Sequence, residues 1–176
     1  MTILNKGYVQ IYTGDGKGKT TAALGLAVRA LSRGLKVCFI QFLKGNESTG
    51  ECALLKEQFK NATAISTGTK KFVFGSPSED DFNEAKRGVD EAKKAVSSNN
   101  YDLVILDEVN GAIDLGIIAL DEIVKMIKNK PDNIELVLTG RGANSELIKL
   151  ADLVTEMMPI KHYYDAGVKE RIGIEK

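Results

Sequence analysis

The sequence predicts an α/β fold, in which a mostly parallel central sheet is covered by helices on both faces. Short apolar runs rich in β-branched residues alternate along the chain with longer segments of helical period, and this alternation is typical of parallel sheets. The first apolar run ends in a glycine-rich turn that leads directly into a helical segment. The chain has 176 residues, enough for a single sizeable core, so we expect residues 1–176 to form one domain.

These patterns predict where the strands and helices lie. The expected strands cover residues 7–13, 36–42, 62–66, 101–106, 134–139 and 152–157. The expected helices cover about residues 19–32, 51–59, 80–97, 120–128 and 145–150. Residues 67–79 contain two glycines and a proline and are predicted to form a loop. The long apolar run at 101–106 predicts a central strand that is buried on both faces.

Composition excludes several classes of function. Lysine plus arginine and aspartate plus glutamate each number 24, so the formal net charge is zero, and a nucleic-acid partner is not expected. The sequence lacks an apolar stretch of about 18 residues, and its polar start is unlike a signal peptide, so we expect a cytoplasmic protein with no membrane partner. Cys38 and Cys52 lack the spacing of a metal or redox motif. Cys38 lies in an apolar run, which predicts a buried, unreactive thiol.

The strongest motif is the glycine-rich loop at residues 13–21 (the P-loop), which lies between a predicted strand and a predicted helix. It reads Thr-Gly-Asp-Gly-Lys-Gly-Lys-Thr-Thr and differs from the usual phosphate-binding pattern at Thr13, where glycine is usual. Glycines let backbone N–H groups turn inward around an anion, and the helix N-terminus adds its positive end. Lys19 is expected to reach the terminal phosphates, and the Thr20 hydroxyl to bind Mg²⁺. The motif therefore predicts a RecA-like P-loop NTPase fold that binds a nucleoside triphosphate with Mg²⁺.

The predicted ATP-binding residues are Gly14, Asp15, Gly16, Lys17, Gly18, Lys19, Thr20 and Thr21. Lys17 adds a second cation suited to a triphosphate, although a solvated lysine explains it equally well.

Two carboxylates follow the predicted central strand. Asp107 and Glu108 should meet the P-loop, because the carboxyl ends of parallel strands share one edge of the sheet. One of them is expected to bind Mg²⁺ directly or through water. Glu108 suits a general base as well, so a P-loop ATPase or small-molecule kinase stays open, as does a non-catalytic nucleotide-gated module. Arg141 reaches the same edge and is expected to contact phosphate or substrate, with a plain surface arginine as the alternative.

Several segments together resemble the P-loop type of ATP:corrinoid adenosyltransferases, the cob(I)alamin adenosyltransferases. They occur in the order expected for that family and cover nearly the whole chain. The segments are residues 13–23, 41–45, 106–108, 138–142, 151–157, 159–162, 165–169 and 173–175. The most specific is the tail, where residues 161–167 read Lys-His-x-x-Asp-Ala-Gly.

The resemblance implies a particular reaction. A corrinoid reduced to Co(I), either cobalamin or a precursor such as cobyrinic acid a,c-diamide, attacks the 5′-carbon of ATP, and inorganic triphosphate leaves. The nucleophile then belongs to the corrinoid, which fits a chain without a recognisable nucleophilic constellation. The family is understood to bind ATP reversed relative to other P-loop enzymes, which would explain Thr13 and the additional Gly16. An electron donor such as a reduced flavoprotein and a homodimer are implied as partners.

The resemblance also assigns roles to residues. The implied catalytic residues are Lys19, Glu108 and Arg141. The implied Mg²⁺ contacts are Thr20 and Glu108, with Asp107 in support. The implied corrinoid-binding residues are Phe72, Phe74, His162 and Asp165.

The two phenylalanines would exclude the lower axial ligand of the corrinoid and so ease reduction of Co(II), although this loop lacks the tryptophan of familiar versions. Well-known relatives carry an N-terminal extension that helps cover the corrinoid. The corresponding segment here is short, so we expect a more open site or cover from a second subunit.

Overall fold

A computed structural model describes residues 4–44, 50–69 and 76–175 of the protein. Six strands form one sheet in the order β3-β2-β4-β5-β1-β6, and every pair of neighbours is parallel. The strands are β1 (Val9–Thr13), β2 (Val37–Gln41), β3 (Ala62–Ser66), β4 (Leu103–Asp107), β5 (Glu135–Thr139) and β6 (Leu153–Glu156). The predicted α/β fold is confirmed, and the described sheet is parallel throughout.

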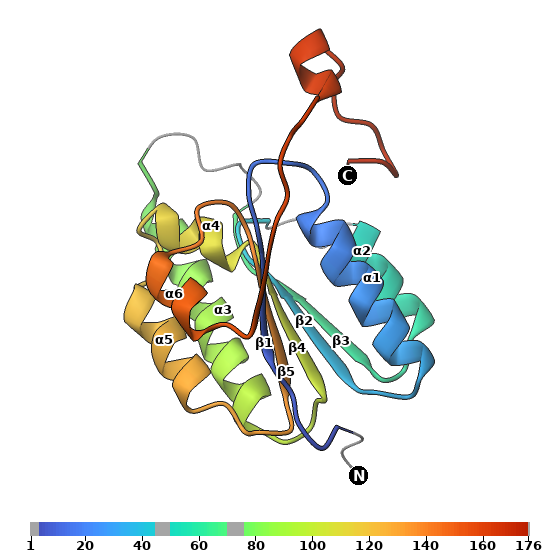
Figure 1. Cartoon of the computed structure of the whole chain (residues 1–176), viewed down its shortest axis with the longest axis vertical. Coiled ribbons are helices and arrows are strands. Elements are labelled where there is room, and N and C mark those ends of the chain that lie inside the picture. Colours follow the sequence, from blue (N-terminus) through green and yellow to red (C-terminus); the bar gives the residue numbers. More distant parts are fainter. Residues whose placement is uncertain (1–3, 45–49, 70–75, 176) are drawn as a thin grey trace.

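Helices cover both faces of the sheet, with α1 and α2 on one side and α3, α4, α5 and α6 on the opposite side (Figure 1). The helices are α1 (Lys19–Ser32), α2 (Gly50–Gln58), α3 (Glu79–Ser97), α4 (Val109–Asp114), α5 (Leu120–Lys128) and α6 (Ser145–Leu150). A C-terminal tail (residues 157–175) rises from β6, forms a short 3₁₀-helix at Tyr163–Ala166, and turns back toward the start of α1 (Figure 1). No described helix combines the length and apolarity needed to cross a bilayer.

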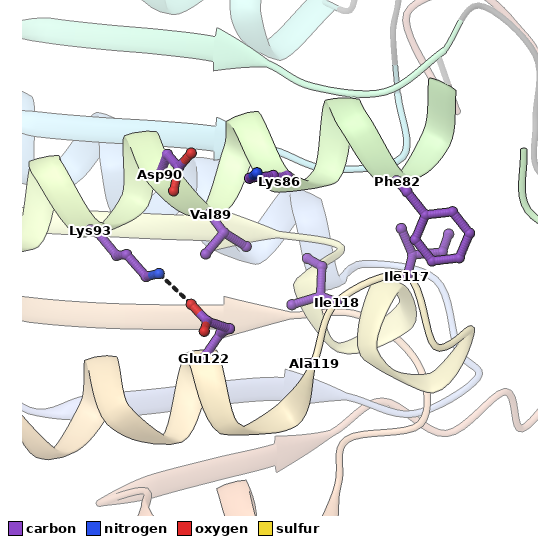
Figure 2. A pocket seen from close by; sticks show the side chains of 9 residues that line it. All are labelled: Phe82, Lys86, Val89, Asp90, Lys93, Ile117, Ile118, Ala119 and Glu122. Carbon is purple, nitrogen blue, oxygen red and sulfur yellow. Dashed lines mark ion pairs between the residues drawn. The ribbon is translucent and has the colours of Figure 1, made fainter. Parts of the chain in front are cut away.

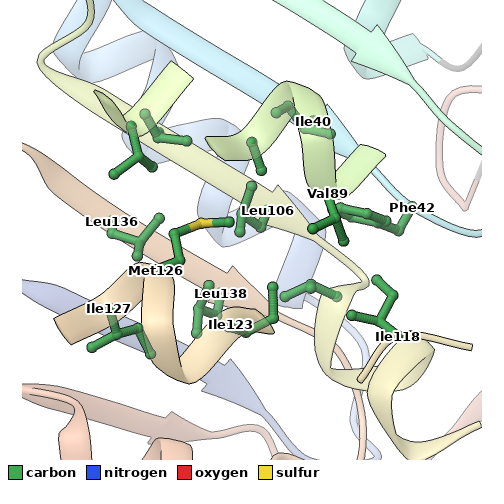
Figure 3. Close-up of a cluster of buried hydrophobic side chains, with 14 of the residues drawn as sticks. Ile40, Phe42, Val89, Leu106, Ile118, Ile123, Met126, Ile127, Leu136 and Leu138 are labelled. Atoms are coloured by element: carbon green, nitrogen blue, oxygen red, sulfur yellow. The ribbon is translucent and has the colours of Figure 1, made fainter. Parts of the chain in front are cut away.

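The central strand β4 supplies side chains to both halves of the core. Leu106 packs in the cluster beneath α3 and α5, whereas Ile105 packs in the cluster beneath α1 and α2, as the two-residue period of a strand requires. Figure 3 shows Leu106 between Leu138 of β5 and Ile40 of β2, with α3 and α5 closing over them. Full burial of each such side chain contributes roughly 1.5–3 kcal/mol. The predicted central, doubly buried strand is confirmed.

Helix α3 begins at a capping box that was not anticipated from the sequence. The Ser78 hydroxyl accepts a hydrogen bond from the backbone N–H of Asp81, and the Asp81 carboxylate accepts one from the backbone N–H of Ser78. These contacts satisfy N–H groups that the first turn leaves unpaired. The helix then buries alanine and valine side chains against the sheet, and Lys93 forms an ion pair with Glu122 of α5 (Figure 2).

Two short elements were missed by the sequence analysis. Helix α4 and the 3₁₀-helix are six and four residues long. The equally short α6 begins after Asn144, whose side chain caps it, whereas α4 begins after Glu108 and has no side-chain cap to mark its start. The loop predicted at 67–79 falls partly outside the described residues. Cys38 is buried, as predicted, and burial raises the pKa of its thiol to about 12, which leaves very little reactive thiolate at neutral pH.

Two glycine substitutions test how tightly the helices pack on the sheet. Gly88→Ala in α3 should lower the free energy of unfolding by about 1–3 kcal/mol, because the added Cβ would lie 2.5 Å from Phe42 Cε1 and 2.6 Å from Thr67 Oγ1. Gly25→Ala in α1 is the matched control, since its Cβ meets nothing within 4 Å. That change should raise the free energy of unfolding by roughly 0.5–1 kcal/mol. Urea denaturation measures both, and a Gly88→Ala protein as stable as wild type would contradict the packing described.

Candidate active site

A cavity of about 460 Å³ lies at the carboxyl edge of the sheet, between the P-loop, the end of β4, the start of α2 and the C-terminal tail. Most of the residues that line it were predicted from the sequence. These are Asp15, Gly16, Lys17, Gly18, Lys19, Thr20, Thr21, Glu108, Arg141 and His162. Residues that line it but were not predicted are Leu24, Lys44, Gly50, Glu51, Gly173, Ile174 and Glu175.

Three other predicted site residues that the structure describes do not line this cavity. Gly14 lies in the loop beneath it, and Asp107 is completely buried at the end of β4. Asp165 is exposed in the 3₁₀-helix of the tail. Phe72 and Phe74 lie outside the described residues, so their assignment stays a prediction.

The P-loop is packed closely against the first residues of the C-terminal tail. The backbone N–H of Gly16 donates to the carbonyl of Met157 at 2.7 Å, and the N–H of Met157 donates to the carbonyl of Thr13 at 2.8 Å. A Cβ at Gly14 or Gly16 would come within 2.5 and 2.7 Å of the Met157 carbonyl oxygen. Gly14 also has φ +93°, a conformation that side chains disfavour. The tail therefore gives the additional Gly16 a structural reason that needs no unusual ATP orientation.

Lys19 lies at the floor of the P-loop. Its ammonium group donates to the carbonyl oxygens of Gly14 at 2.6 Å and Gly16 at 2.9 Å, which leaves one of its three N–H donors for a ligand. Burial lowers the pKa of Lys19, and the carboxylate of Glu108 partly offsets that effect. The geometry thus holds a cation beneath the loop that would receive a phosphate group.

The buried carboxylate of Asp107 is held by the two neighbouring strands. Its Oδ1 accepts a hydrogen bond from the Thr139 hydroxyl at 2.7 Å, and its Oδ2 accepts one from Gln41 Nε2 at 3.0 Å. Nζ of Lys44 lies 3.8 Å from Oδ2. Because both oxygens already have partners, Asp107 suits a supporting role better than a direct metal contact.

Glu108 is the carboxylate that faces the cavity. Its backbone adopts a left-handed conformation with φ 62°, and its N–H donates to the Thr139 hydroxyl at 2.9 Å. The same hydroxyl donates to Asp107, so one threonine of β5 fixes both acids. Burial and the charge of Asp107 raise the pKa of Glu108, while Lys44, Lys19 and Arg141 oppose the rise.

The donor groups here fit Mg²⁺ bound together with a nucleotide. The described residues hold no group of three or more His, Cys, Asp or Glu side chains arranged for a metal. Mg²⁺ is usually held by one or two carboxylates plus substrate phosphates and waters. The Thr20 hydroxyl and the Glu108 carboxylate at the cavity supply the hard oxygen donors that this requires.

Two further cations border the cavity. Arg141 lies across the P-loop, where its Nη2 donates to the carbonyl of Asp15 at 3.3 Å. Lys44 was missed, together with Gln41, although Gln41 is the last residue of β2 and Lys44 follows it three positions later. A signal was available, because β2 is the neighbour of β4 and its carboxyl end meets the same edge.

The tail brings His162 to the cavity and binds Lys17. The His162 Nδ1 accepts a hydrogen bond from the backbone N–H of Tyr164 at 3.1 Å, so its ring caps the 3₁₀-helix. The ammonium group of Lys17 contacts Tyr163, Ile174 and Glu175.

A second cavity of about 280 Å³ lies between α3 and the start of α5, with Phe82, Val89, Ile117 and Ile118 in its lining (Figure 2). Among the residues that the structure describes, none of the predicted site residues lines it.

Comparison with known proteins relates this chain to one family. Residues 5–175 match the family model described as ATP:corrinoid adenosyltransferase BtuR/CobO/CobP. The chain is 37% identical over 171 residues to a corrinoid adenosyltransferase of Escherichia coli K12, an alignment covering 97% of this chain and 86% of the relative. It is 34% identical to the corrinoid adenosyltransferase CobA of Salmonella typhimurium, with the same coverage of 97% and 86%. A corrinoid adenosyltransferase of Pseudomonas aeruginosa is 35% identical, with 97% and 84% covered.

The charge of Glu108 should cost stability in the protein without ligands. Its pKa is raised above the ordinary 4.5, so its favourable contribution to folding is complete below that value and is lost as the pH rises through the folded-state pKa. Glu108→Gln should therefore raise the midpoint of thermal unfolding at neutral pH, with a difference that shrinks toward pH 4.5. Thermal scans across this pH range in a chelator measure it. Glu57→Gln, an exposed change on α2, should leave the midpoint unchanged, and a destabilised Glu108→Gln protein would contradict the account.

Proposed function

Because the chain belongs to the ATP:corrinoid adenosyltransferase family, we propose that it transfers the 5′-deoxyadenosyl group of MgATP to the Co(I) centre of a corrinoid and releases inorganic triphosphate. The observation that carries this proposal is the cavity in which the P-loop, Glu108 and Arg141 meet, since the family match spans all three. We also propose that residues 1–176 form one domain.

In this reaction the protein must bind and stabilise the leaving group, inorganic triphosphate. The electron pair of Co(I) forms the cobalt–carbon bond to C5′, and the C5′–O bond breaks with its electrons staying on the triphosphate oxygen. Negative charge therefore grows on the triphosphate, and preorganised donors aimed at that charge lower the barrier. The free N–H donor of Lys19, the backbone N–H groups of the P-loop and the guanidinium of Arg141 lie where they can supply this stabilisation.

We assign Glu108 to Mg²⁺ binding and Asp107 to holding Glu108 in position at the carboxyl edge of the sheet. Thr20 and Glu108 would hold Mg²⁺, with Asp107 fixing Glu108 through the shared Thr139 hydroxyl. Bound Mg²⁺ neutralises charge on the phosphate oxygens. Lys44, which lies 3.8 Å from Asp107, adds positive charge on the β2 side of the cavity.

The corrinoid would lie above the cavity, near the tail. His162 lines the cavity, and Asp165 follows it in the same 3₁₀-helix. We assign both residues, with Phe72 and Phe74, to the corrinoid on the strength of the resemblance. A reduced flavoprotein as electron donor and a homodimer are proposed on the same basis.

The competing function is a P-loop ATPase or small-molecule kinase that uses Glu108 as its base. One observation favours it, because the raised pKa of Glu108 brings this carboxyl closer to the value that suits a general base at neutral pH.

Product analysis separates the two functions. The protein is incubated with MgATP labelled in the γ-phosphate and a chemically reduced Co(I) corrinoid, and the products are resolved by chromatography. Adenosyl transfer predicts a light-sensitive cobalt–carbon product and an equal amount of labelled triphosphate. Labelled orthophosphate with ADP, formed equally fast without the corrinoid, would instead establish the hydrolase and overturn the proposal.

Lys19→Met should lower the rate of adenosyl transfer by about 10²–10³-fold, as removal of a preorganised charge donor does elsewhere. The methionine keeps the length of the side chain and lacks the charge. The initial rate of cobalt–carbon bond formation at saturating Co(I) corrinoid measures the effect, with Lys128→Met, an exposed change on α5, as the control. Wild-type rates in the Lys19→Met protein would show that the triphosphate does not lie in the P-loop.

A further inference from the structure

The C-terminal tail is attached to the P-loop by polar contacts centred on Lys17. The ammonium group of Lys17 donates to the Tyr163 hydroxyl at 3.0 Å, to the carbonyl oxygen of Ile174 at 2.9 Å and to Oε1 of Glu175 at 3.1 Å. A lysine has three N–H donors, and these three acceptors use all of them. In this arrangement Lys17 keeps no donor for a phosphate group.

Glu175 is bound from a second side by Arg171. Its Oε1 accepts from Arg171 Nη2 at 3.0 Å, and its Oε2 accepts from the backbone N–H of Arg171 at 2.8 Å. The Tyr163 hydroxyl also donates to Glu175, and the Arg171 guanidinium lies 5.1 Å from the centre of the Tyr163 ring. Lys17, Tyr163, Arg171 and Glu175 thus form one connected group, the tail cluster.

Apolar burial does little to hold the end of the tail in place. Ile172 is 88% exposed and Ile174 is 56% exposed, so these side chains gain little from the hydrophobic effect that stabilises the core. The tail cluster must then supply much of what fixes residues 171–175. Because Gly173, Ile174 and Glu175 line the 460 Å³ cavity, the position of one wall of that cavity depends on Lys17.

We propose that Lys17 is a positioning residue, which through the tail cluster fixes the C-terminal tail as a wall of the nucleotide cavity, and that it is not a phosphate ligand. The inference rests on the proposed function only for the identity of the occupant, ATP. The fixed wall keeps Gly173, Ile174 and Glu175 at the border of the cavity that would hold the nucleotide. Lys17, which the sequence suggested as a cation for the triphosphate, instead holds the tail in place beside the nucleotide cavity.

Two substitutions with the same outcome test this assignment. Lys17→Met and Glu175→Gln each remove one side of the charge pair, and tryptic cleavage after Lys169 and Arg171 reports release of the tail. Each variant should be cleaved about tenfold faster than wild type, the factor expected for losing a hydrogen bond to a charged group. The double variant should be cleaved no faster than either single variant, since both act through the same cluster. Lys128→Met should be cleaved in the tail at the wild-type rate.

The affinities for MgATP and tripolyphosphate show whether Lys17 positions the cavity wall or contacts phosphate. The dissociation constants of MgATP and of tripolyphosphate are measured by calorimetry without any corrinoid. A wall predicts that both variants weaken MgATP binding by similar factors and change tripolyphosphate binding in the same direction. If Lys17→Met weakens tripolyphosphate binding while Glu175→Gln tightens it, Lys17 contacts phosphate and the proposal fails.

Unchanged tail cleavage in both variants would overturn the tail cluster directly. The role of Lys17 and the proposed function can be contradicted separately. A wild-type protein that binds neither MgATP nor tripolyphosphate contradicts the proposed function, and the nucleotide wall with it, while tail cleavage still decides whether Lys17 holds the tail.

Discussion

The burial of the Asp107 carboxylate constrains the rest of the site. A charge without solvent at the end of the central strand is costly unless it is paired and hydrogen-bonded, and the partners here come from the strands on either side. Gln41 of β2 and Thr139 of β5 each hold one carboxylate oxygen. These hydrogen bonds connect the adjacent strands β2, β4 and β5 at the carboxyl edge of the sheet, where the P-loop also lies. The arrangement leaves Glu108, the next residue, as the acid that faces the cavity.

The P-loop depends on contacts from both ends of the chain. It follows the first strand, yet its shape is set against Met157, which follows the last strand. The ammonium group of Lys19 contacts the carbonyl oxygen of Gly14 within the loop, and that of Lys17 contacts the carbonyl oxygen of Ile174 in the tail. The loop is therefore one part of a cradle that includes the C-terminal tail, and this explains why residues so far apart in sequence line one cavity.

The fold and the floor of the site could be predicted because their signals are local. A strand, a glycine-rich loop and a helix stand next to one another, and the ends of α1 and α5 fall at the predicted residues. Asp107 and Glu108 were recognisable because they follow an apolar strand. Which of the two acids is buried could not be predicted, since the distinction rests on hydrogen bonds from Gln41 and Thr139.

The parts that were missed arise from contacts across long sequence separations. Glu108 adopts a left-handed conformation that glycine or asparagine would normally signal. Lys44 reaches Asp107 across 63 positions, and Lys17 reaches Glu175 across 158. No periodicity or spacing marks such pairs. Helix α4 was missed for a local reason, because no side chain caps its start, whereas Asn144 caps the equally short α6.

The central claim is that the bond broken in ATP is C5′–O and that the triphosphate leaves whole. An ATP analogue whose β- and γ-phosphorus atoms are joined by a methylene group tests this directly, because its terminal phosphate cannot be removed. With this analogue and a Co(I) corrinoid, the account predicts continued formation of the adenosylated corrinoid with release of the methylene-bridged triphosphate. Binding of the analogue without any adenosyl transfer, by a protein that converts ATP itself to ADP, would contradict it.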